Sequence, residues 1–237
     1  MKTMLTTAAL AAMAAAIAVP ASAQVSGIGV ADPAVVVAGS KALQGAYAQI
    51  GTTYQAQRTQ LEQLDRQRIA ILKKFDKNGD GKLDEAEQKA AQAANNPDRK
   101  QLETVQDQIN KIQQPINLAG AYAVEQVAQQ LNPAVQQVIS QGGVQLILPS
   151  NGVIYAAASA NVTEKLIAAL DQRLPSVSIT PPAGWQPNQD TVQLFQDVQQ
   201  VRLAAAMRQQ QAQQAAGQSQ KPAATPATKP ATSTKGR

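Results

Sequence analysis

Apolar residues recur at alternating steps of three and four along two stretches of the chain. The first stretch comprises Ile50, Tyr54, Gln57, Leu61, Leu64, Arg68, Ile71 and Phe75, with two polar interruptions. The second comprises Leu102, Val105, Ile109, Ile112, Ile116, Ala119 and Ala123. This spacing places the apolar positions on one stripe of a helix, as in helices that pair as coiled coils. One compact turn joins the stretches, so the sequence predicts a long antiparallel helical hairpin, an arm spanning residues 43–141.

The alternative to an extended arm is a compact four-helix bundle. Such a bundle buries several apolar helix faces in one core, and the chain offers few apolar helices beyond the two stripes. Aromatic residues make up only 3% of the sequence, which also argues against a large globular core. We therefore expect the extended pair.

Shorter elements with a different pattern flank the arm. Before it, Val25–Ala31 is expected to be a short extended segment, and Asp32 followed by Pro33 indicates a capped helix start. After it, the apolar period becomes two, which predicts strands at Val144–Leu148 and Val153–Ala157. The Asn-Gly pair between these strands is a strong signal for a β-hairpin turn.

The predicted fold class is α+β, mainly α, with the long helical hairpin standing on a small β-sheet body. Both chain ends would form this body, from residues 24–42 and 142–174, the latter including an amphipathic helix over Val162–Leu174. Strands at the two ends of one hairpin should meet at its base. Edge strands there would be exposed, and assembly with other copies would cover them.

The two termini have distinct compositions. Residues 1–23 combine Lys2, an apolar run and the small-residue site Ala21-Ser22-Ala23, which indicates a cleavable export signal and a mature chain starting at Gln24. Residues 175–208 form a C-terminal extension, and residues 209–237, rich in Gln, Ala, Pro, Thr and Lys, are expected to be disordered. We predict a periplasmic protein with no transmembrane segment.

The C-terminal extension contains the only tryptophan, Trp185. It could pack an extended segment against the body, or it could act as a recognition element, since tryptophan is common in both settings. A further helix is expected over Thr191–Met207.

The turn of the arm contains the sequence DKNGDGKLDEAE, which matches the calcium loop of an EF-hand. Gly81 stands at the sixth position, where the chain must turn sharply. The expected ligands are Asp76, Asn78, Asp80, the backbone carbonyl of Lys82, Asp84 and the bidentate carboxylate of Glu87. A single loop of this kind should bind calcium weakly, at about 10⁻⁴–10⁻³ M, in a structural role. The alternative is a solvated run of charges at a helix turn.

Composition removes several classes of function. The chain has no His and no Cys, which excludes catalytic sites and metal sites built from those residues. It also has no phosphate-binding glycine loop or nucleophile elbow, so we do not expect an enzyme. The net charge of +5 comes from Lys2 and the basic tail, since residues 24–208 hold sixteen basic and sixteen acidic side chains. We therefore do not expect a nucleic-acid-binding face.

The order of these elements resembles the OmpH/Skp family of periplasmic chaperones. The segment IGVADPAVVVAGSKAL (Ile28–Leu43) is similar to the opening strand and helix of that family. The segment LILPSNGVIYAAASANVTEKLIAAL (Leu146–Leu170) is similar to its closing strands and helix. The resemblance implies a homotrimer whose sheets form a body and whose arms enclose a cavity. It also implies an ATP-independent holdase that binds unfolded outer-membrane proteins.

Three features depart from that family. The calcium loop is an insertion at the arm tip, the charges near the turn are mixed rather than strongly basic, and the extension past Leu174 has no counterpart. The alternative function is an exported calcium-binding coiled-coil protein that serves as a structural or assembly element without chaperone activity. The periodicity of the arm fits both functions.

Overall fold

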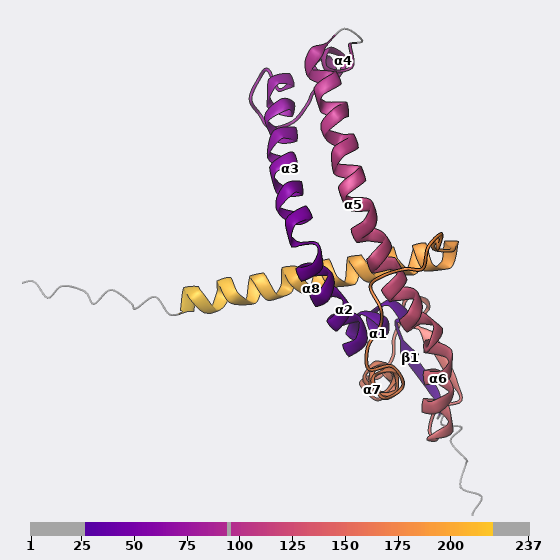
Figure 1. The fold of residues 1–237 in the computed structure, drawn as a ribbon. Coiled ribbons are helices and arrows are strands. Elements are labelled where there is room, and N and C mark those ends of the chain that lie inside the picture. Colours follow the sequence, from indigo (N-terminus) through magenta and orange to yellow (C-terminus); the bar gives the residue numbers. More distant parts are fainter. Residues whose placement is uncertain (1–26, 94–95, 220–237) are drawn as a thin grey trace, which may run out of the picture.

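The computed structural model describes residues 27–93 and 96–219. A pair of long helices rises from a small body, and a third long helix crosses the base of the pair (Figure 1). The expected export signal, its cleavage site and the mature start at Gln24 lie outside the described residues, as do residues 220–237. Within the described ranges, no helix has both the length and the apolar character needed to cross a bilayer.

Helices dominate the chain, and the only sheet among the described residues has two strands. In chain order the elements are β1 (Ile28–Ala31), α1 (Pro33–Gly39), α2 (Lys41–Thr53), α3 (Gln55–Phe75), α4 (Glu85–Ala91), α5 (Pro97–Gln129), α6 (Leu131–Ser140), β2 (Leu146–Pro149), α7 (Thr163–Arg173) and α8 (Gln189–Ser219). Two short 3₁₀ helices, η1 (Ser150–Gly152) and η2 (Ala158–Ala160), follow β2. The predicted fold class, α+β and mainly α, is confirmed.

Local side-chain chemistry sets the helix boundaries. The Asp32 carboxylate accepts hydrogen bonds from the N–H groups of Ala34 and Val35, at 2.8 and 3.2 Å, and Pro33 occupies the first position of α1. The Asn96 side chain caps α5 in the same way, again with a proline at its first position. Both starts follow from side chains that satisfy N–H groups which the first helical turn leaves unpaired.

The arm is the antiparallel pair α3 and α5, as the heptad pattern predicts (Figure 1). Its apolar contacts form one cluster, here called the arm cluster, composed of buried Leu64, Ile71, Phe75, Val105 and Ile109 and partly buried Leu61, Leu72, Leu83, Ala91, Leu102 and Ile112. Apart from Leu72 of α3, these residues come from the two predicted stripes and from the tip. Burial of this single seam stabilises the pair.

The lower ends of the two stripes belong to a second core. Ile50, Ala119 and Ala123 pack with residues of α1, α6, α7 and α8 in what is here called the body cluster. The helical path is interrupted at Tyr54, which separates α2 from α3 with φ −104° and ψ 24°. The out-and-back pairing is therefore shared between two cores that meet near this interruption.

The sheet differs from the predicted hairpin. Strand β1 pairs in parallel with β2, with Ile28 opposite Leu146, and the segment Val153–Ala157 is not a strand. A tight Asn-Gly hairpin turn needs positive φ at its central residues, whereas neither Asn151 nor Gly152 has one. The chain forms the 3₁₀ turn η1 instead and does not reverse onto β2.

The C-terminal helix is longer than predicted. Helix α8 extends to Ser219, so the described part of the segment expected to be disordered, residues 209–219, is helical. Its glutamines and alanines have favourable helix propensity, and no proline interrupts them before residue 222. The prediction of disorder was therefore wrong for residues 209–219, because a segment rich in Gln and Ala can continue a helix that has already started.

Two neighbouring isoleucines of α3 test the arm. Ile71 is buried in the arm cluster with 3% of its surface exposed, whereas Ile69 is 49% exposed on the same helix. Ile71→Ala should lower the free energy of unfolding by about 2–5 kcal/mol, because it leaves a cavity in the seam. Ile69→Ala should change it by less than about 0.5 kcal/mol. Urea unfolding followed by circular dichroism gives both values, and equal effects would contradict the seam.

Candidate functional site

The first candidate site is the loop at the arm tip, between α3 and α4. Its glycines at the fourth and sixth positions, Gly79 and Gly81, have φ of +74° and +80°, a conformation that glycine adopts without strain. The Asp76 carboxylate accepts hydrogen bonds from both of their N–H groups, at 2.7 and 2.9 Å. The Asn78 oxygen accepts from the N–H of Asp80 at 2.9 Å. Side-chain oxygens thus hold this loop in a tight series of turns.

Glu87 closes the loop from the other end. Its carboxylate accepts hydrogen bonds from the N–H groups of Lys77, Asn78 and Asp84, at 2.6, 3.2 and 3.0 Å. Asp84 in turn accepts from the N–H of Glu87, so the pair forms a capping box at the start of α4. Glu87 is only 6% exposed, which is unusual for a carboxylate and reflects these bonds.

The structure thus places the predicted ligands in one loop, but it does not converge them on one point. In the described chain, no group of three or more acidic side chains has the arrangement of a metal site. The Asp80 carboxylate accepts from the N–H of Lys82 at 2.8 Å, so it also serves the backbone. Every oxygen side chain in this loop is of the type that calcium prefers, and Glu87 faces the start of the loop. Calcium binding by Asp76, Asn78, Asp80, Lys82, Asp84 and Glu87 stays a prediction.

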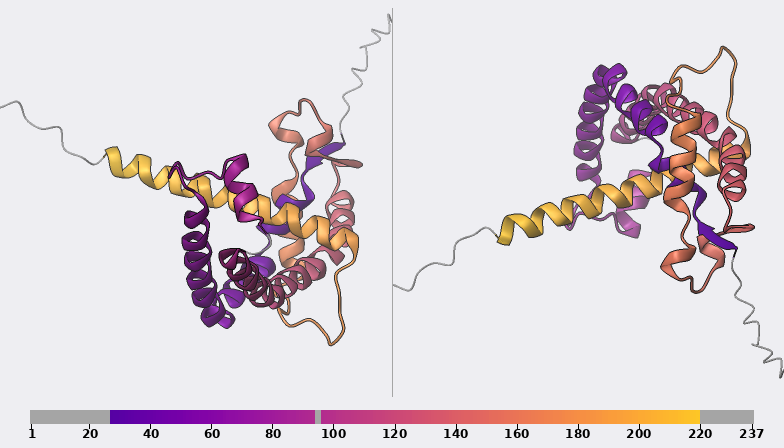
Figure 2. Two further views of the ribbon diagram at one scale, coloured as in Figure 1. Left: turned by 90° about the horizontal axis from the view of Figure 1, so that it is seen from above. Right: turned by 90° about the horizontal axis from the view of Figure 1, so that it is seen from below.

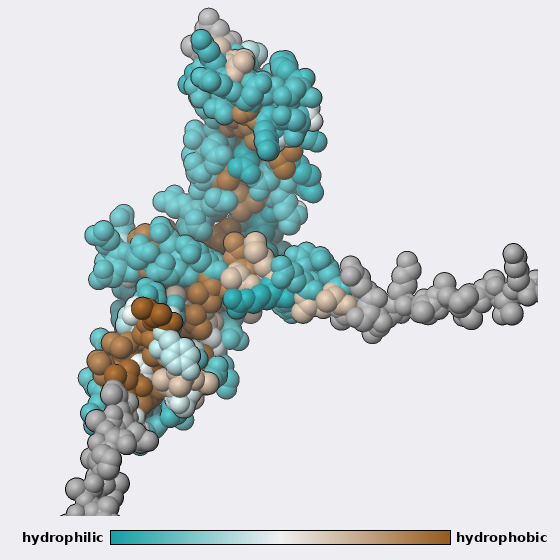
Figure 3. Space-filling view, turned by 180° about the vertical axis from the view of Figure 1, so that it is seen from behind, coloured by the Kyte–Doolittle hydropathy of each residue, from teal (hydrophilic) through white to brown (hydrophobic). Residues whose placement is uncertain are grey.

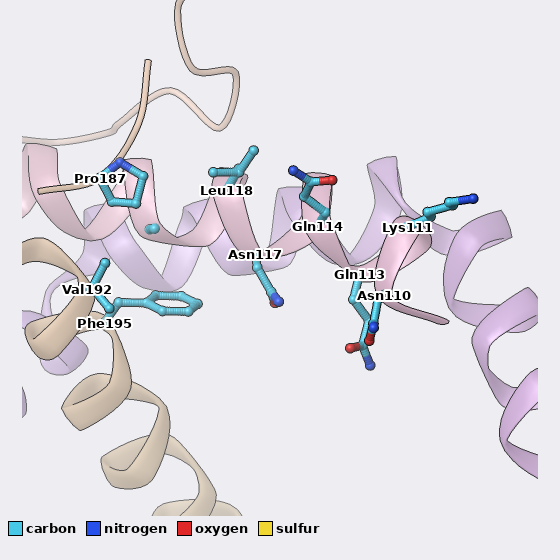
Figure 4. Close-up of a pocket in the computed structure, with 10 residues that line it drawn as sticks. Asn110, Lys111, Gln113, Gln114, Asn117, Leu118, Pro187, Val192 and Phe195 are labelled. Atoms are coloured by element: carbon cyan, nitrogen blue, oxygen red, sulfur yellow. The ribbon is translucent and has the colours of Figure 1, made fainter. Parts of the chain in front are cut away.

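The second candidate site is a pocket at the root of the arm, here called the root pocket. It is an open groove of about 500 Å³ in the angle between α5 and the first turns of α8. Phe195, Val192 and Pro187 supply its apolar side from the C-terminal extension, and Leu118 and Ala121 supply apolar surface from α5. Lys111 and four amide side chains of α5, Asn110, Gln113, Gln114 and Asn117, line the rest (Figure 4).

Helix α8 packs closely against α5 beside this pocket. Gly120 has no side chain, and a Cβ placed there would come within 2.9 Å of the Phe195 ring. The glycine therefore provides the notch in α5 against which Phe195 packs. Further along α8, Val198 is fully buried in the body cluster.

Tyr47 of α2 forms the other anchor of α8. The guanidinium of Arg202 lies over its ring, 3.3 Å from the centroid, and Gln199 donates a hydrogen bond to its hydroxyl at 3.2 Å. Burial raises the pKa of the Tyr47 hydroxyl above its ordinary value, and the nearby Arg202 charge offsets part of that rise. Helix α8 thereby connects α2 and α5, the two lower limbs of the arm.

The segment between α7 and α8 is fastened along α5. Gln126 of α5 makes two hydrogen bonds to the backbone of Ser178, at 2.8 and 3.0 Å. Trp185 lies edge-on to the ring of Tyr122, with centroids 5.0 Å apart. Of the two roles considered for Trp185, this contact supports packing of the extended segment against the body.

Among the described residues, the body contains an apolar segment that no other element covers. Ile154 and Tyr155, in the segment once expected to be a strand, are 107% and 84% exposed. Leu146 of β2 is half exposed as well. Seen from behind, hydrophobic residues gather on the body, whereas the outer surface of the arm is mainly hydrophilic (Figure 3). A face of this kind is typical of surfaces covered by assembly.

The model of the outer membrane protein (OmpH-like) family matches residues 27–170. The chain belongs to this family. The match covers the body and the whole arm, including the tip loop, and ends within α7. It leaves the connecting segment and α8 outside.

One solved structure is similar to this OmpH-like protein. It is an OmpH-like protein from Caulobacter crescentus, proposed to be an outer membrane chaperone. The two share 21% sequence identity, and the alignment covers 65% of the present chain and 88% of the other, with a TM-score of 0.40. No curated protein matches the sequence at a significant level.

Sequence reasoning missed the root pocket of this OmpH-like protein. The signal was present in part, because Val192, Phe195 and Val198 form an apolar stripe that indicated a packed helix. The stripe does not indicate which element α8 packs against. A glycine within a long helix, Gly120, is the residue that would have suggested a close approach by another element.

Two glycine substitutions test the docking of α8. Gly120→Ala should lower the thermal midpoint by several degrees, because the new methyl group displaces Phe195. Gly45→Ala lies within α2, where a Cβ would meet nothing within 4 Å, and should instead stabilise by about 0.5–1 kcal/mol. The thermal midpoint of each variant checks this, and a matching increase in both would contradict the notch.

Proposed function

We propose that this OmpH-like protein is an ATP-independent holdase in the periplasm that binds unfolded outer-membrane proteins. The observation that carries the proposal is an extended arm, fixed to a body with an unpartnered apolar face, in a chain of the OmpH-like family. A holdase needs no hydrolytic centre, because it grips a client through many weak contacts. The absence of His, Cys and nucleotide-binding motifs from the sequence accords with that role.

The arm contributes length, so that it can extend along a client, rather than a deep binding site. Helix α3 has 21 residues and α5 has 33, which at about 1.5 Å per residue gives the pair a length of several tens of ångströms. The apolar side chains of the seam pack against each other, and the outer faces of the two helices carry Gln, Lys, Arg, Asp and Glu. A single arm therefore holds little of an unfolded chain, and several arms around one space would hold more.

Assembly into a homotrimer would supply those arms. The largely exposed segment Val153–Ala157 has the composition of a strand and follows the two-stranded sheet in the chain. Among the described residues, β2 has no strand on its outer edge, whereas β1 bridges to Asn161 on its own outer side. Pairing with another copy would satisfy its backbone and cover Ile154 and Tyr155. In this proposal the residues that failed to form an intramolecular hairpin form the contact between subunits.

The assembly and the holdase can be tested together. The mature wild-type protein should have the mass of a trimer in light scattering, and should stop a denatured outer-membrane barrel from aggregating on dilution without ATP. Ile154→Lys should give monomers with most of the suppression lost, because a charge cannot be buried between strands. Ile69→Lys, a change of the same kind at a half-exposed site on the arm, should keep both properties.

A monomeric mass for the wild-type protein would contradict the proposed trimer. A trimer without suppression would favour the alternative of a structural coiled-coil protein.

We further propose that the tip loop binds calcium weakly and in a structural role. The ion would neutralise the acids of the loop and fix the angle between α3 and α4. The oxygen donors and the two positive-φ glycines support this assignment.

Calorimetry on the mature protein tests the calcium site. Binding at about 10⁻⁴–10⁻³ M is expected for the wild type, and Glu87→Gln should abolish it, because an amide cannot act as a bidentate carboxylate ligand. Glu85→Gln is the control, since Glu85 is an exposed acid in the same loop at a position that supplies no side-chain ligand. Equal heats from wild type and Glu87→Gln would refute the site.

A further inference from the structure

We propose that the root pocket binds an apolar side chain of an unfolded polypeptide, while the amides around it bind the neighbouring backbone. The proposal rests on the holdase function proposed above and assigns it a defined contact point. Part of the pocket comes from α8, which lies beyond the family match, so the site is a feature of this chain's extension.

The pocket has a floor that suits an apolar group. The Phe195 ring extends along α5 towards Asn117, with Gln113 and Asn110 further along the helix (Figure 4). Val192 is 38% exposed at the pocket, so its side chain offers apolar surface that the chain itself leaves uncovered. A volume of about 500 Å³ accommodates one or two large side chains of a peptide.

The rim suits a peptide backbone. In the described chain, the side chains of Gln113, Gln114 and Asn117 make no hydrogen bond, although each can both donate and accept. An extended backbone presents N–H and C=O groups in alternation. An amide side chain can accept a hydrogen bond from the former and donate one to the latter. Because the amides are uncharged, they do not select a client by the charge of its side chains. A holdase that binds varied clients requires such a lack of selection.

The charge of the lining argues for an uncharged occupant. Lys111 is the only charged residue among the ten that line the pocket, and it is exposed. A phosphate or carboxylate ligand would be expected to meet more than one cation, and a metal ion would need acidic ligands, which the lining lacks. Strands of outer-membrane barrels alternate apolar and polar residues, so every second side chain of such a client could enter the pocket.

The site has a built-in reporter. Trp185 is the only tryptophan in the chain, lies two residues before Pro187 of the lining, and contacts Tyr122 beside Ala121. Its fluorescence should therefore respond when the pocket fills. The probe is a short capped peptide that alternates Leu with Ser and lacks Trp, and the control peptide has Ser in place of Leu.

Full-length mature protein is titrated with each peptide. We expect the Leu peptide to produce a saturable change in Trp185 emission, and the Ser peptide to produce none. Val192→Glu places a carboxylate at the pocket and should weaken the Leu peptide at least about tenfold. Leu203→Glu is the matched control on the same helix, at a 58% exposed position outside the pocket, and should leave the affinity unchanged.

Equal affinity of the Leu peptide for wild type and Val192→Glu, or no binding to wild type, overturns the proposal. If the wild type still suppresses barrel aggregation in either case, the holdase stands without the pocket. If suppression fails although the pocket binds the peptide, the holdase is the part that is wrong. A peptide that binds only after removal of residues 220–237 would show that the chain's own tail fills the pocket, which also overturns the proposal.

Discussion

The architecture depends on how little surface a helical pair can bury. Two helices that meet along one seam remove only one stripe of each from water, and the arm cluster contains five buried residues. The arm cannot set its own direction with so small a core. Its position is therefore fixed at the root, where α2 and α5 enter the larger body cluster and α8 packs against α5. Helix α8 runs across the molecule and projects beyond it on one side (Figure 2).

Helix α8 provides further contacts that hold the root of the arm in place. It reaches α5 through Phe195 at Gly120 and reaches α2 through Arg202 at Tyr47, so it ties together the two limbs that continue into the arm. The same docking leaves an open angle between α5 and α8, and that angle is the root pocket. The position of the arm and the shape of the pocket are thus linked, because both depend on how α5 packs against α8.

Patterns repeated over many residues predicted the arm well, and single local signals predicted the body less well. The heptad spacing of Leu61, Leu64, Ile109 and their neighbours predicts two helices that pair, and the compact turn between them makes the pair antiparallel. The Asn151-Gly152 signal competed with Pro149 and with a parallel pairing of β2 to β1, which sequence alone does not reveal. The tip loop could be located by its spacing, whereas the direction of each oxygen depends on backbone contacts. The root pocket joins residues of α5 to residues that lie 66 to 85 positions further along the chain, which no local pattern encodes.

The separation of the two cores has a consequence for how proteins of this build can change over time. Because the arm cluster ends before the interruption at Tyr54, matched segments of whole helical repeats can be gained or lost from α3 and α5 without disturbing the body. The tip tolerates additions even more readily, since its loop lies at the end of the arm that is remote from the body (Figure 1). A new loop can thus be acquired at the far end of the arm while the root, where α8 docks on α5, keeps its sequence and shape.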